Sequence, residues 1–598
     1  MFAFAILVLA TIAAFFIVQH LKSTTPLIKG MTRPLPFSDN GDGCRTNAAI
    51  NFYVLHHSDS VTVWVVDSAG DIVQTVASGV EMQTPTPGHD RVRRTFYWYG
   101  RETDGQLAPD GTYHFQVGLS DQDRYVPLTQ YPVVVDNAPP RLVVTGVTPS
   151  QLPAPGRVPA TVHFTGSNGS AGYLLIYRTS VAGPPQLVDV RHIFHSKPHS
   201  DRGYTKKWAG LIDGRPAPAG TYVTALKVVS PACVTGTFPV YLPPRDGTTA
   251  HGGLTVSYLA AEAPLDSVPA GTDALVGVAS DRHPYRWALR RVGAKRKLIS
   301  RGSGTSTSLR VHLPGRSAGL YELAIRSAGH RTVAPLVARA PTSTDPILVI
   351  LPALTWQGLN PVDDNGDGFP DTLASGGAID LDRPADGLPP GFGGEAALLS
   401  YLDHTRMPYD LTTDIALADG SGPTLARHSG VVFAGPEEWL PAALAPELER
   451  YVEQGGRVLS LGAGSLQRTA TLTDTAAGPQ AKDPTPAAAT DILGARPGAL
   501  VSHNSEAIVV TGRDRLGLFR GTSGAFSGFG SFEPILAVAP PGRIASAAGT
   551  TAQTPTIVGY RLGSGIVVDI GLPTFTASLG RDVDTQELLR RLWSILSH

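Results

Sequence analysis

One segment occurs twice in the first half of the chain, and it limits what that half can fold into. Three short motifs return in the same order about 110 residues later. The first copy is Trp98-Tyr99-Gly100, Asp104-Gly105 and Ala108-Pro109-Asp110-Gly111-Thr112-Tyr113, and the second is Trp208-Ala209-Gly210, Asp213-Gly214 and Ala217-Pro218-Ala219-Gly220-Thr221-Tyr222. This period is that of one β-sandwich. Each copy predicts a core Trp, an Asp-Gly turn and a Pro-x-Gly-x-Tyr segment that opens an edge strand. We therefore expect two successive β-sandwiches, at residues 31–136 and 137–243.

The composition agrees with several β-rich domains. The chain has 598 residues, which is enough for about three to five domains. Only 17% of the residues are charged, while 65 are Gly and 50 are Pro, and this balance favours sandwiches with many turns over helical bundles. The formal net charge is −1, so no nucleic-acid partner is expected. The two cysteines, Cys44 and Cys233, leave open one disulfide between the first two domains or two free thiols.

The first 30 residues predict attachment to a membrane. Phe2 to Val18 is an uncharged stretch of 17 residues, which is the lower limit for a membrane-spanning helix. Because no small-x-small cleavage site precedes the polar region, we expect an uncleaved signal anchor at residues 1–30, a single pass through the cell membrane and an extracytoplasmic body. The alternative is a cleaved signal and a secreted protein. Basic residues normally flank a membrane helix on its cytoplasmic side, which here would be before the stretch. The basic residues instead follow it, at Lys22, Lys29 and Arg33, and a basic region upstream of the given start would explain this.

Residues 244–340 predict a third β-rich domain. Strands are expected at 254–258, 274–278 and 320–325. Basic residues gather between Arg286 and Arg301, which fits either contact with an acidic surface polymer or a solvated hairpin. Residues 315–319 match the G-x-S-x-G pattern of a hydrolase nucleophile. That motif needs a strand, a turn and a helix, whereas strands flank both sides here, so a hairpin turn is expected.

After residue 341 the pattern changes to strands that alternate with helices. Buried strands are expected at 347–351, 430–435 and 457–462, and helices at 394–406, 441–454 and 584–596. A strand, a helix and a strand in succession predict a right-handed parallel unit. Residues 471–490, rich in Thr, Ala and Pro, predict a mobile insertion. Residues 341–598 are therefore expected to form one α/β domain.

An acidic loop follows the first of these buried strands. Side-chain oxygens at Asp363, Asn365 and Asp367 alternate along the loop, and Asp371 completes the set. Such oxygens suit a calcium ion, and their spacing resembles calcium loops of the dockerin and thrombospondin-repeat type, although Ala374 stands where an EF-hand has a bidentate Glu. We expect a structural calcium ion at these four residues. The alternative is a turn without an ion, since Asp, Asn and Gly favour turns anyway.

The repeated segment resembles the immunoglobulin-like domain found in the flagellar hook-capping protein and in many bacterial surface proteins. The first copy also carries Pro36-Phe37-Ser38-Asp39-Asn40-Gly41-Asp42-Gly43, which is similar to the FSPNGDG opening of such domains. The resemblance covers about residues 31–243 and implies tandem spacer or adhesion modules rather than an enzyme. Asp39 and Asp42 are expected to form a turn, with cation binding as the alternative.

The last domain resembles the C-terminal domain of the large (beta) subunit of N,N-dimethylformamidase, whose fold is akin to class I glutamine amidotransferases. The resemblance is carried by VILPALTWQGLN at 349–360, AGPEEW at 434–439, EQGGRVL at 453–459 and GSGIVV at 563–568. It spans about residues 345–598 and implies a three-layer, flavodoxin-like α/β domain. Its value as a sign of activity depends on whether the reactive residues are kept.

The reactive residues are not kept in full. An amidotransferase site needs an activated Cys, and no cysteine follows Cys233. The formamidase family is understood to use iron held by Tyr and Glu, but the tyrosine of its A-Y-N motif is Leu359 here, and its H-x-E-Y-W motif reads Gly435-Pro436-Glu437-Glu438-Trp439. Glu438 is the candidate metal ligand or acid–base residue, because it follows the carboxyl end of a strand. The alternative is an acid in the first turn of the next helix.

The sequence therefore predicts a multidomain protein with an N-terminal membrane helix, tandem β-sandwiches, a β-rich domain and an α/β three-layer amidotransferase-like domain. We expect a membrane-anchored surface protein whose spacers present a non-catalytic domain for binding a ligand or partner, such as a cell-envelope polymer or protein. One alternative is a metal-dependent hydrolase of amide or glycan bonds related to N,N-dimethylformamidase. Another is a purely structural envelope protein.

Overall fold

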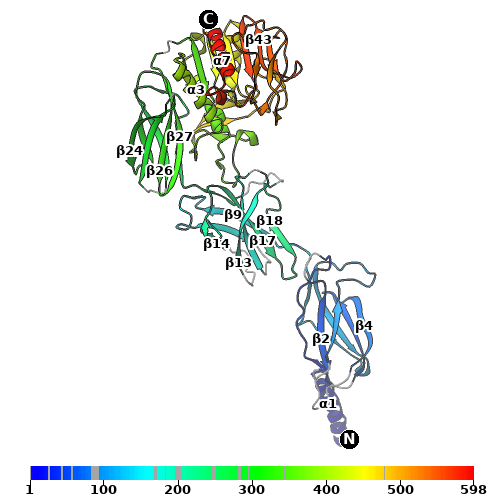
Figure 1. Cartoon of the computed structure of the whole chain (residues 1–598). Helices are drawn as coiled ribbons and strands as arrows, with labels where there is room; N and C mark the ends of the chain where they lie inside the picture. The colour runs from blue at the N-terminus through cyan, green and yellow to red at the C-terminus, as the bar shows by residue number, and fades with distance from the viewer. Residues whose placement is uncertain are drawn as a thin grey trace.

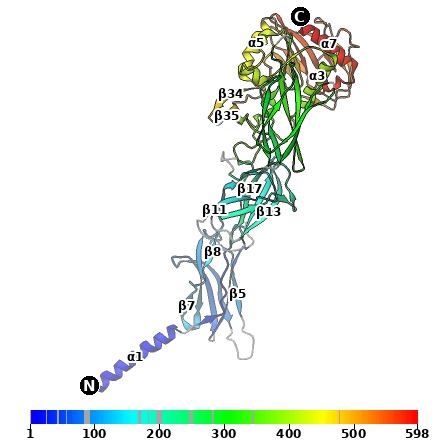
Figure 2. The ribbon, with the colours of Figure 1, turned by 90° about the vertical axis from the view of Figure 1, so that its left-hand side faces the viewer.

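Three β-domains in a row lead to a larger α/β domain, which we call the head (Figure 1). The computed structural model describes residues 2–24, 27–41, 45–55, 58–82, 93–166, 171–181, 183–194, 204–244, 251–280, 284–293, 295–342, 345–476 and 478–598. The N-terminal helix lies at one end of the row and the C-terminus lies on the head, and Figure 2 shows the same extended order from a second side. The β-domains therefore form a stalk between the N-terminal helix and the head.

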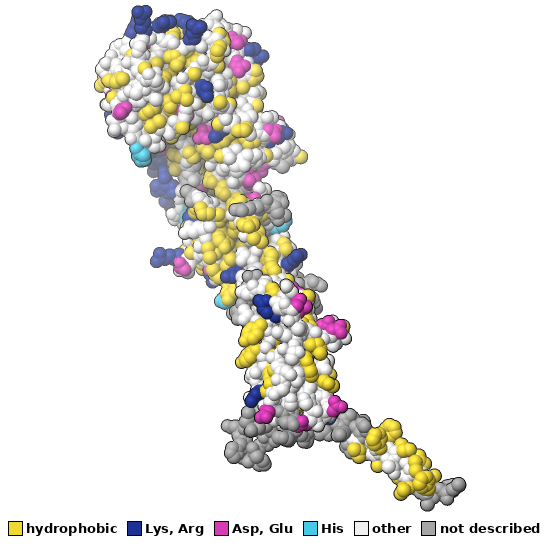
Figure 3. All heavy atoms as spheres, turned by 90° about the vertical axis from the view of Figure 1, so that its right-hand side faces the viewer, with side chains coloured by type: hydrophobic (Ala, Val, Ile, Leu, Met, Phe, Trp, Pro, Cys, Tyr) yellow, Lys and Arg dark blue, Asp and Glu magenta, His cyan; other side chains and the backbone are white. Residues whose placement is uncertain are grey.

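The N-terminal segment forms α1 (Phe2–Thr24), which projects from the first β-domain. Its described side chains include exposed apolar residues such as Phe4, which is 73% exposed, and Phe16, which is 67% exposed. Figure 3 shows this apolar surface standing clear of the stalk. Within the described residues, no helix combines the length and the apolar character that a membrane crossing requires. The signal anchor stays a prediction.

The first β-domain is a sandwich of two sheets, with strand orders β1-β2-β5 and β4-β3-β6-β7, and with β8 paired to β6. One apolar core fills the space between these sheets. The strands are β1 (Ile28–Lys29), β2 (Ala48–Val54), β3 (Ser58–Val66), β4 (Ile72–Met82), β5 (Arg94–Trp98), β6 (Gly111–Leu119), β7 (Arg124–Pro127) and β8 (Val133–Val135).

The second β-domain is also a sandwich, with strand orders β14-β11-β9 and β10-β19-β17-β12-β13, and with β18 paired to β17. Its strand β19 pairs with β17 and β10, so the boundary predicted at residue 244 falls before a strand of this sandwich. The strands are β9 (Leu142–Thr148), β10 (Gln151–Leu152), β11 (Ala160–Gly166), β12 (Ala171–Arg178), β13 (Gln186–Phe194), β14 (Tyr204–Trp208), β17 (Gly220–Val229), β18 (Thr235–Phe238) and β19 (Gly253–Val256), with a small hairpin of β15 (Leu211–Ile212) and β16 (Arg215–Pro216).

Both copies of the repeated segment adopt the same local structure. Trp98 and Trp208 are fully buried, as predicted. The hydroxyls of Tyr113 and Tyr222 each donate a 2.7 Å hydrogen bond to the proline carbonyl four residues earlier. The prediction that this segment opens an edge strand is wrong, because β6 and β17 each pair with strands on both sides. The turn residues show where a strand starts, but they say nothing about its place in the sheet.

A hydrogen bond joins the two sandwiches at their junction, close to a disulfide-bonded cysteine. Cys233 is disulfide-bonded, so the alternative of two free thiols is wrong. Cys44 lies outside the described residues. Close to Cys233, Arg45 Nη1 of the first sandwich donates a 2.8 Å hydrogen bond to the carbonyl of Pro231 in the second. The stalk is therefore held at this junction rather than linked only by the chain.

The third β-domain has two sheets, with strand orders β20-β22-β25 and β21-β27-β26-β23-β24. Residues 313–318, which hold the G-x-S-x-G match, join β25 of one sheet to β26 of the other, so strands flank the match as predicted, but the predicted hairpin is wrong because β25 and β26 do not pair. The strands are β20 (Leu259–Glu262), β21 (Val268–Pro269), β22 (Asp273–Ser280), β23 (Tyr285–Arg291), β24 (Lys297–Gly304), β25 (Ser308–His312), β26 (Gly319–Ser327) and β27 (His330–Arg339).

The head is built on a nine-stranded sheet with the order β30-β28-β31-β33-β44-β43-β42-β38-β39. Its first five strands are parallel: β28 (Ile347–Leu351), β30 (Asp410–Thr413), β31 (Gly430–Phe433), β33 (Arg457–Leu461) and β44 (Gly565–Ile570). Numbered along the chain, they stand in the flavodoxin-like order 2-1-3-4-5. The antiparallel strands are β43 (Pro555–Leu562), β42 (Arg543–Gly549), β38 (Ile508–Thr511) and β39 (Ala525–Phe526).

Helices cover both faces of this sheet, so the head has three layers. Alternate residues of β28 enter opposite cores, because successive strand side chains point to opposite faces. Val349 packs with α3 (Phe392–Thr405) and α7 (Val583–Leu596), while Ile350 packs with α5 (Ala445–Glu453). The short helices α2 (Ala353–Gly358) and α4 (Asp414–Ala418) follow β28 and β30 directly. The carboxyl ends of the parallel strands therefore lead straight into α2 and α4.

The segment predicted as a mobile insertion is in part a β-hairpin. Strands β34 (Thr469–Thr475) and β35 (Gly478–Lys482) pair with each other and join β29 (Ile379–Asp380) and β32 (Leu440–Pro441). The prediction is wrong for these strands, because hydrogen bonds to strands far away in the sequence order them. The helix predicted from residue 441 starts later for the same reason, since Leu440–Pro441 pairs as a strand.

Candidate functional site

The acidic loop begins just after α2, near the carboxyl end of β28, and folds around its own side chains. Asp363 accepts three backbone N–H bonds from within the loop, at 2.8, 3.1 and 2.9 Å. Asp371 accepts the N–H of Asp364 at 2.7 Å, and Asn365 accepts the N–H of Asp367 at 2.8 Å. The structure therefore brings the four predicted ligand residues together as a set of Asx turns.

Two carboxyl groups of this loop, those of Asp363 and Asp367, are harder to ionise than usual. Burial raises the pKa of Asp363 to about 6, hydrogen bonds from the backbone oppose this, and the charges of Asp367 and Asp371 add to it. Burial also raises the pKa of Asp367. A divalent cation would favour the charged forms, yet among the described residues no group of three or more His, Cys, Asp or Glu is placed to hold one. Calcium at Asp363, Asn365, Asp367 and Asp371 therefore stays a prediction.

The loop is also where the head meets the second sandwich. Thr179, just beyond β12, donates its hydroxyl hydrogen bond to the carbonyl of Gly368. A Cβ on Gly253, in β19, would lie 2.2 Å from the carbonyl oxygen of Gly366, and a Cβ on Gly368 would lie 2.5 Å from the carbonyl oxygen of Tyr222. Glycine alone permits this approach of one backbone to another. The acidic loop is therefore where the second sandwich of the stalk contacts the head, and we call this contact the joint.

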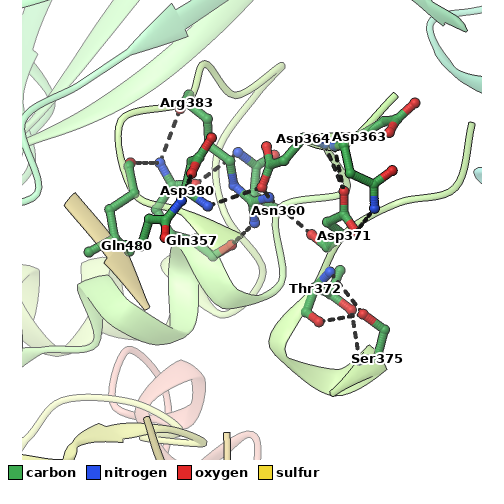
Figure 4. Close-up of polar contacts among 12 residues, drawn as sticks. Gln357, Asn360, Asp363, Asp364, Asp371, Thr372, Ser375, Asp380, Arg383 and Gln480 are labelled. Atoms are coloured by element: carbon green, nitrogen blue, oxygen red, sulfur yellow. Dashed lines mark hydrogen bonds and ion pairs between the residues drawn. The ribbon is translucent and has the colours of Figure 1, made fainter. Parts of the chain in front are cut away.

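A buried arginine fixes the base of the loop (Figure 4). The Arg383 side chain is 3% exposed and pairs with Asp364 at 2.7 Å. It also donates hydrogen bonds to the carbonyls of Gln357, at 2.5 Å, and Asp371, at 3.0 Å. The Gln357 amide in turn donates to the carbonyls of Leu381 and Arg383, each at 3.0 Å. Because these partners lie on α2, on the loop and on the segment after it, one side chain holds three parts of the joint together.

The predicted candidate Glu438 lies at the surface. Its side chain is 31% exposed and pairs with Arg468 at 3.5 Å, while the Arg468 guanidinium lies 5.2 Å from the centre of the Trp439 ring. Partial burial raises the pKa of Glu438, and the charge of Arg468 opposes this shift. Glu438 is therefore placed as the partner of a partly exposed arginine.

Three other carboxyl groups meet near the carboxyl ends of the parallel strands. Asp414 begins α4 directly after β30, Glu437 follows β31, and Glu395 lies in the first turn of α3. All three are buried, and the charges of Asp414 and Glu395 both act on Glu437. Strands β28 and β31 are neighbours at the point where the chain order of the sheet reverses, which is where open α/β sheets form ligand sites.

These buried carboxyl groups differ in their hydrogen-bond partners. Asp414 accepts the N–H groups of Leu354 at 3.0 Å and Ile415 at 2.8 Å. Within the described residues, the Glu395 carboxyl faces the Trp356 indole and the Glu437 carboxyl faces Asp414, and the oxygens of both are closed off from solvent. Burial raises the pKa of Glu395 to about 8, and burial together with Asp414 raises the pKa of Glu437 well above its usual value. At neutral pH the cluster therefore holds protonated carboxyl groups, with Asp414 best supported to carry charge.

A cavity of about 320 Å³ adjoins Glu395. Its walls include Gly391, Gly435, Leu572 and Phe575. A Cβ on Gly435 would lie 2.5 Å from Glu395 Oε1, and a Cβ on Gly391 would lie 3.0 Å from the same atom. The Glu395 carboxyl therefore packs against two glycines of the cavity wall and lies behind them rather than lining the cavity itself.

The residues at this edge do not fit the iron that the formamidase resemblance implies. Leu359 replaces a tyrosine, and Glu438, at the other tyrosine position, is engaged by a surface arginine. The described part of the chain places no three acidic, His or Cys side chains so that they could share an ion. His428 lies at the opposite, amino edge of the sheet, with its ring nitrogens 3.0 Å from Asp410 and 2.8 Å from the carbonyl of Thr424. No catalytic step through iron follows from this arrangement.

A larger cavity, of about 520 Å³, lies where the second sandwich, the third β-domain and the head meet. We call it the joint cavity. Its apolar walls come from all three domains and include Val256, Ala279 and Trp356, and the segment 384–390 lines it from the head. Arg178 brings a guanidinium to the wall, and its buried Nε has no hydrogen-bond partner in the described structure. This volume is in the usual range for small-molecule sites.

Sequence reasoning missed Glu395, Asp414 and Glu437 for a physical reason. Glu437 and Glu438 are neighbours in the segment after β31, and one is buried while the other pairs with a surface arginine. The motif itself held the signal, because Glu437 stands at the acidic position of the H-x-E-Y-W pattern. Asp414 and Glu395 each lie in the first turn of a helix, where carboxylates are common for electrostatic reasons alone. Only the fold shows that these three approach one another.

Comparison with known proteins supports the resemblance of the head. A family model described as N,N-dimethylformamidase beta subunit-like, C-terminal, matches residues 303–489. The match includes the joint, the acidic loop and the segment that holds Glu437. It is less than half of the chain, so it identifies a region that is similar to this family. No curated protein matches the chain.

Proteins of known structure give only distant likenesses. Dimeric latent PorU from Porphyromonas gingivalis is 10% identical over 52% of this chain and 34% of its own, with a TM-score of 0.13. Two marsupial T cell receptor chains are 11% and 10% identical, over 52% and 51% of this chain and 98% and 99% of theirs, with TM-scores of 0.15 and 0.19. The chain thus spans about a third of the PorU chain. TM-scores this low carry no argument about fold or function.

Proposed function

We propose that this protein presents a ligand-binding, non-catalytic head at the end of a β-domain stalk, which α1 attaches to a membrane. Residues 303–489, which include part of the third β-domain and the first part of the head, are similar to the N,N-dimethylformamidase beta subunit family. The apolar α1 and the head lie at opposite ends of the molecule, which is the arrangement that a spacer between a membrane and a binding domain requires (Figures 1 and 2). The bulk of the chain is then extracytoplasmic.

The observation that carries the binding role is the joint cavity. Its walls are mainly apolar, and one of them is formed by Trp356, which is only 6% exposed. The guanidinium of Arg178 adds one cationic group to the wall, and its Nη2 also donates a 3.1 Å hydrogen bond to the carbonyl of Ala219. This combination suits a small ligand with an apolar body and a carboxylate, because Arg binds carboxylates through paired N–H donors.

The alternative, a metal-dependent hydrolase of amide or glycan bonds, draws support from the buried carboxyl groups of Glu395, Asp414 and Glu437. Protonated carboxyl groups beside a cavity are the kind of feature that marks acid–base sites. Against it stand the engaged Glu438 and the missing tyrosine at Leu359. A binding head needs none of these groups to react.

Calorimetric titration of the purified full chain with a panel of small monocarboxylates, phenylacetate among them, tests the binding role. We expect saturable binding that weakens at least tenfold in Arg178→Gln. Arg215→Gln is the matched control, because Arg215 is an exposed arginine of the same sandwich. If no panel member binds, or if both variants bind as the unchanged protein does, the joint cavity is not the ligand site.

Two further measurements separate the rest of the proposal from its rival. Protease treatment of intact cells that express the full chain should cleave the head, and removal of residues 2–24 should release the protein from the membrane fraction. Metal analysis of the purified chain should find no iron or zinc that Glu437→Gln removes. Iron or zinc lost in this variant, together with hydrolysis of an amide or glycan, would replace the binding proposal with the hydrolase.

A further inference from the structure

Three arginines stand side by side on one face of the third β-domain. In the strand register Arg286 of β23 lies opposite Arg326 of β26, and Arg326 lies opposite Arg331 of β27. All three are exposed, whereas their neighbours Tyr285 and Ile325 are buried in the domain core. Residues directly opposite in an antiparallel sheet share a face, so these side chains form one row across three strands. We call it the arginine row.

The row is extended by a fourth cation and is not neutralised from within. Arg301 of β24 is exposed and lies opposite Ala288, two residues along β23 from Arg286 and on the same face. Glu322 shares this face, but it is buried and already pairs with Arg296 at 2.8 Å. Among the described residues, no ion pair is formed by the three arginines of the row.

The arginine row destabilises the folded domain unless a bound anion neutralises its charges. Like charges directly opposite each other in a sheet repel and are destabilising. Charged side chains also protect exposed sheet edges from pairing with other chains, but β23 and β26 are interior strands of the order β21-β27-β26-β23-β24. Edge protection therefore does not account for Arg286 and Arg326. An external polyanion would turn the repulsion into attraction.

We propose that the arginine row binds a linear acidic polysaccharide that bears carboxylates. Neighbouring strands place successive arginines roughly 5 Å apart, which suits a polymer with a negative group on each sugar. The planar guanidinium matches a carboxylate with two N–H donors. Small side chains at Ala288 and Ala324 lie beside the row, so no aromatic ring stands there for the base stacking that single-stranded nucleic acids use.

This proposal goes beyond the binding of a small ligand and needs neither the joint cavity nor a reactive head. The net charge of the chain is −1, so the attraction is local to the row rather than a property of the whole surface. The row lies on the stalk domain that adjoins the head (Figure 1). A polymer bound there would hold the stalk against a surface while leaving the cavity at the joint free.

The test measures binding of the purified full chain to immobilised polygalacturonate by interferometry, with neutral dextran as the blank. Three charged contacts predict that log K falls with log salt with a slope of about −2, or roughly 15-fold between 50 and 200 mM salt. We expect Arg326→Glu to weaken binding at least tenfold. Arg310→Glu is the matched control, because Arg310 is exposed on β25 in the opposite sheet and undergoes the same charge change.

Each outcome decides the proposal once thermal melting shows that both variants are folded. A loss confined to Arg326→Glu supports the row as the binding site. Equal losses in both variants would mean that overall charge alone governs binding, and would overturn the proposal. Absence of binding to polygalacturonate, or tighter binding to polyphosphate or single-stranded DNA than to polygalacturonate, would overturn the choice of an acidic polysaccharide.

Discussion

The acidic loop predicts that the joint between stalk and head is loosened by rising pH and tightened by calcium. The pKa of Asp363 is about 6 in the folded protein, against a usual value of 3.8, so the folded state binds this proton more tightly than the unfolded state. The stabilising contribution is therefore complete below about pH 4 and is lost as the pH rises to about 6. Above that pH, a bound calcium ion would take over the role of the proton.

The magnitude follows from the pKa and from the exposure of the loop. A rise from 3.8 to about 6 corresponds to at most about 3 kcal/mol. Asp363 is only partly buried, so we expect solvent screening to reduce this to about 1–2 kcal/mol. In a domain the size of the head, this is roughly 3–6 °C in melting temperature.

Scanning calorimetry of the full chain between pH 4.5 and 7.5 measures this contribution as the difference between the unchanged protein and Asp363→Asn. The amide does not titrate, so the variant should lose the part of the pH dependence that Asp363 supplies. Calcium at pH 7.5 should raise the melting temperature of the unchanged protein and not of the variant. Asp104→Asn is the control, because Asp104 accepts a 2.9 Å N–H bond in an exposed turn of the first sandwich.

The reasoning fails if Asp363→Asn keeps the full pH slope of the unchanged protein. It also fails for calcium if the ion stabilises the variant and the unchanged protein equally. A calcium effect that is absent from both, with the pH slope changed as expected, would leave the loop as a proton-dependent joint made of turns. That result would select the alternative of a turn without an ion.

Three further predictions test the joint and the buried carboxyl groups. Arg383→Met leaves the Asp364 carboxylate without its partner, so we expect about 3–5 kcal/mol of destabilisation in denaturant unfolding; a change below about 1 kcal/mol would contradict the network. Glu395→Gln should match the unchanged protein in melting temperature at pH 4.5 and exceed it at pH 8. The reason is that a carboxyl whose pKa is raised from 4.5 to about 8 loses up to about 5 kcal/mol of stability between these values; equal melting temperatures at pH 8 would refute this. Gly253→Ala should open the joint and expose the acidic loop to limited proteolysis, because its Cβ would lie 2.2 Å from the loop backbone. Gly146→Ala, in the same sandwich with nothing within 4 Å of the new Cβ, should not.

Local signals in the sequence predicted most of the stalk. The recurring Trp and Tyr residues each occupy the same place in their sandwich, since a buried ring and a tyrosine hydroxyl that reaches back four residues are set by spacing alone. The position of a strand within its sheet depends on partners far along the chain. For that reason β6 and β17 were expected at sheet edges and lie inside, and β19 belongs to a sandwich that precedes the expected boundary.

The candidate sites show the same division. The acidic loop was recognised because its residues are close together in the sequence, and the fold adds that Thr179 and Gly253 of another domain hold it. The sequence alone does not show whether Glu437 or Glu438 is the better candidate for a functional site, because the choice depends on which of them faces the core. The arginine row was visible only as a basic stretch, because the alignment of Arg286 with Arg326 depends on strand register.

The sequence by itself determined the main strands of the stalk, the first parallel strands of the head and the turn-rich acidic loop, and it marked a resemblance to the formamidase family, because these properties depend on residues close along the chain. Tertiary structure alone decided which carboxyl groups are buried together, where the joint cavity lies and which arginines stand opposite each other. The physical reason is that burial, pKa and charge repulsion depend on distances in space. The chain sets those distances only when its strands have paired and its domains have met.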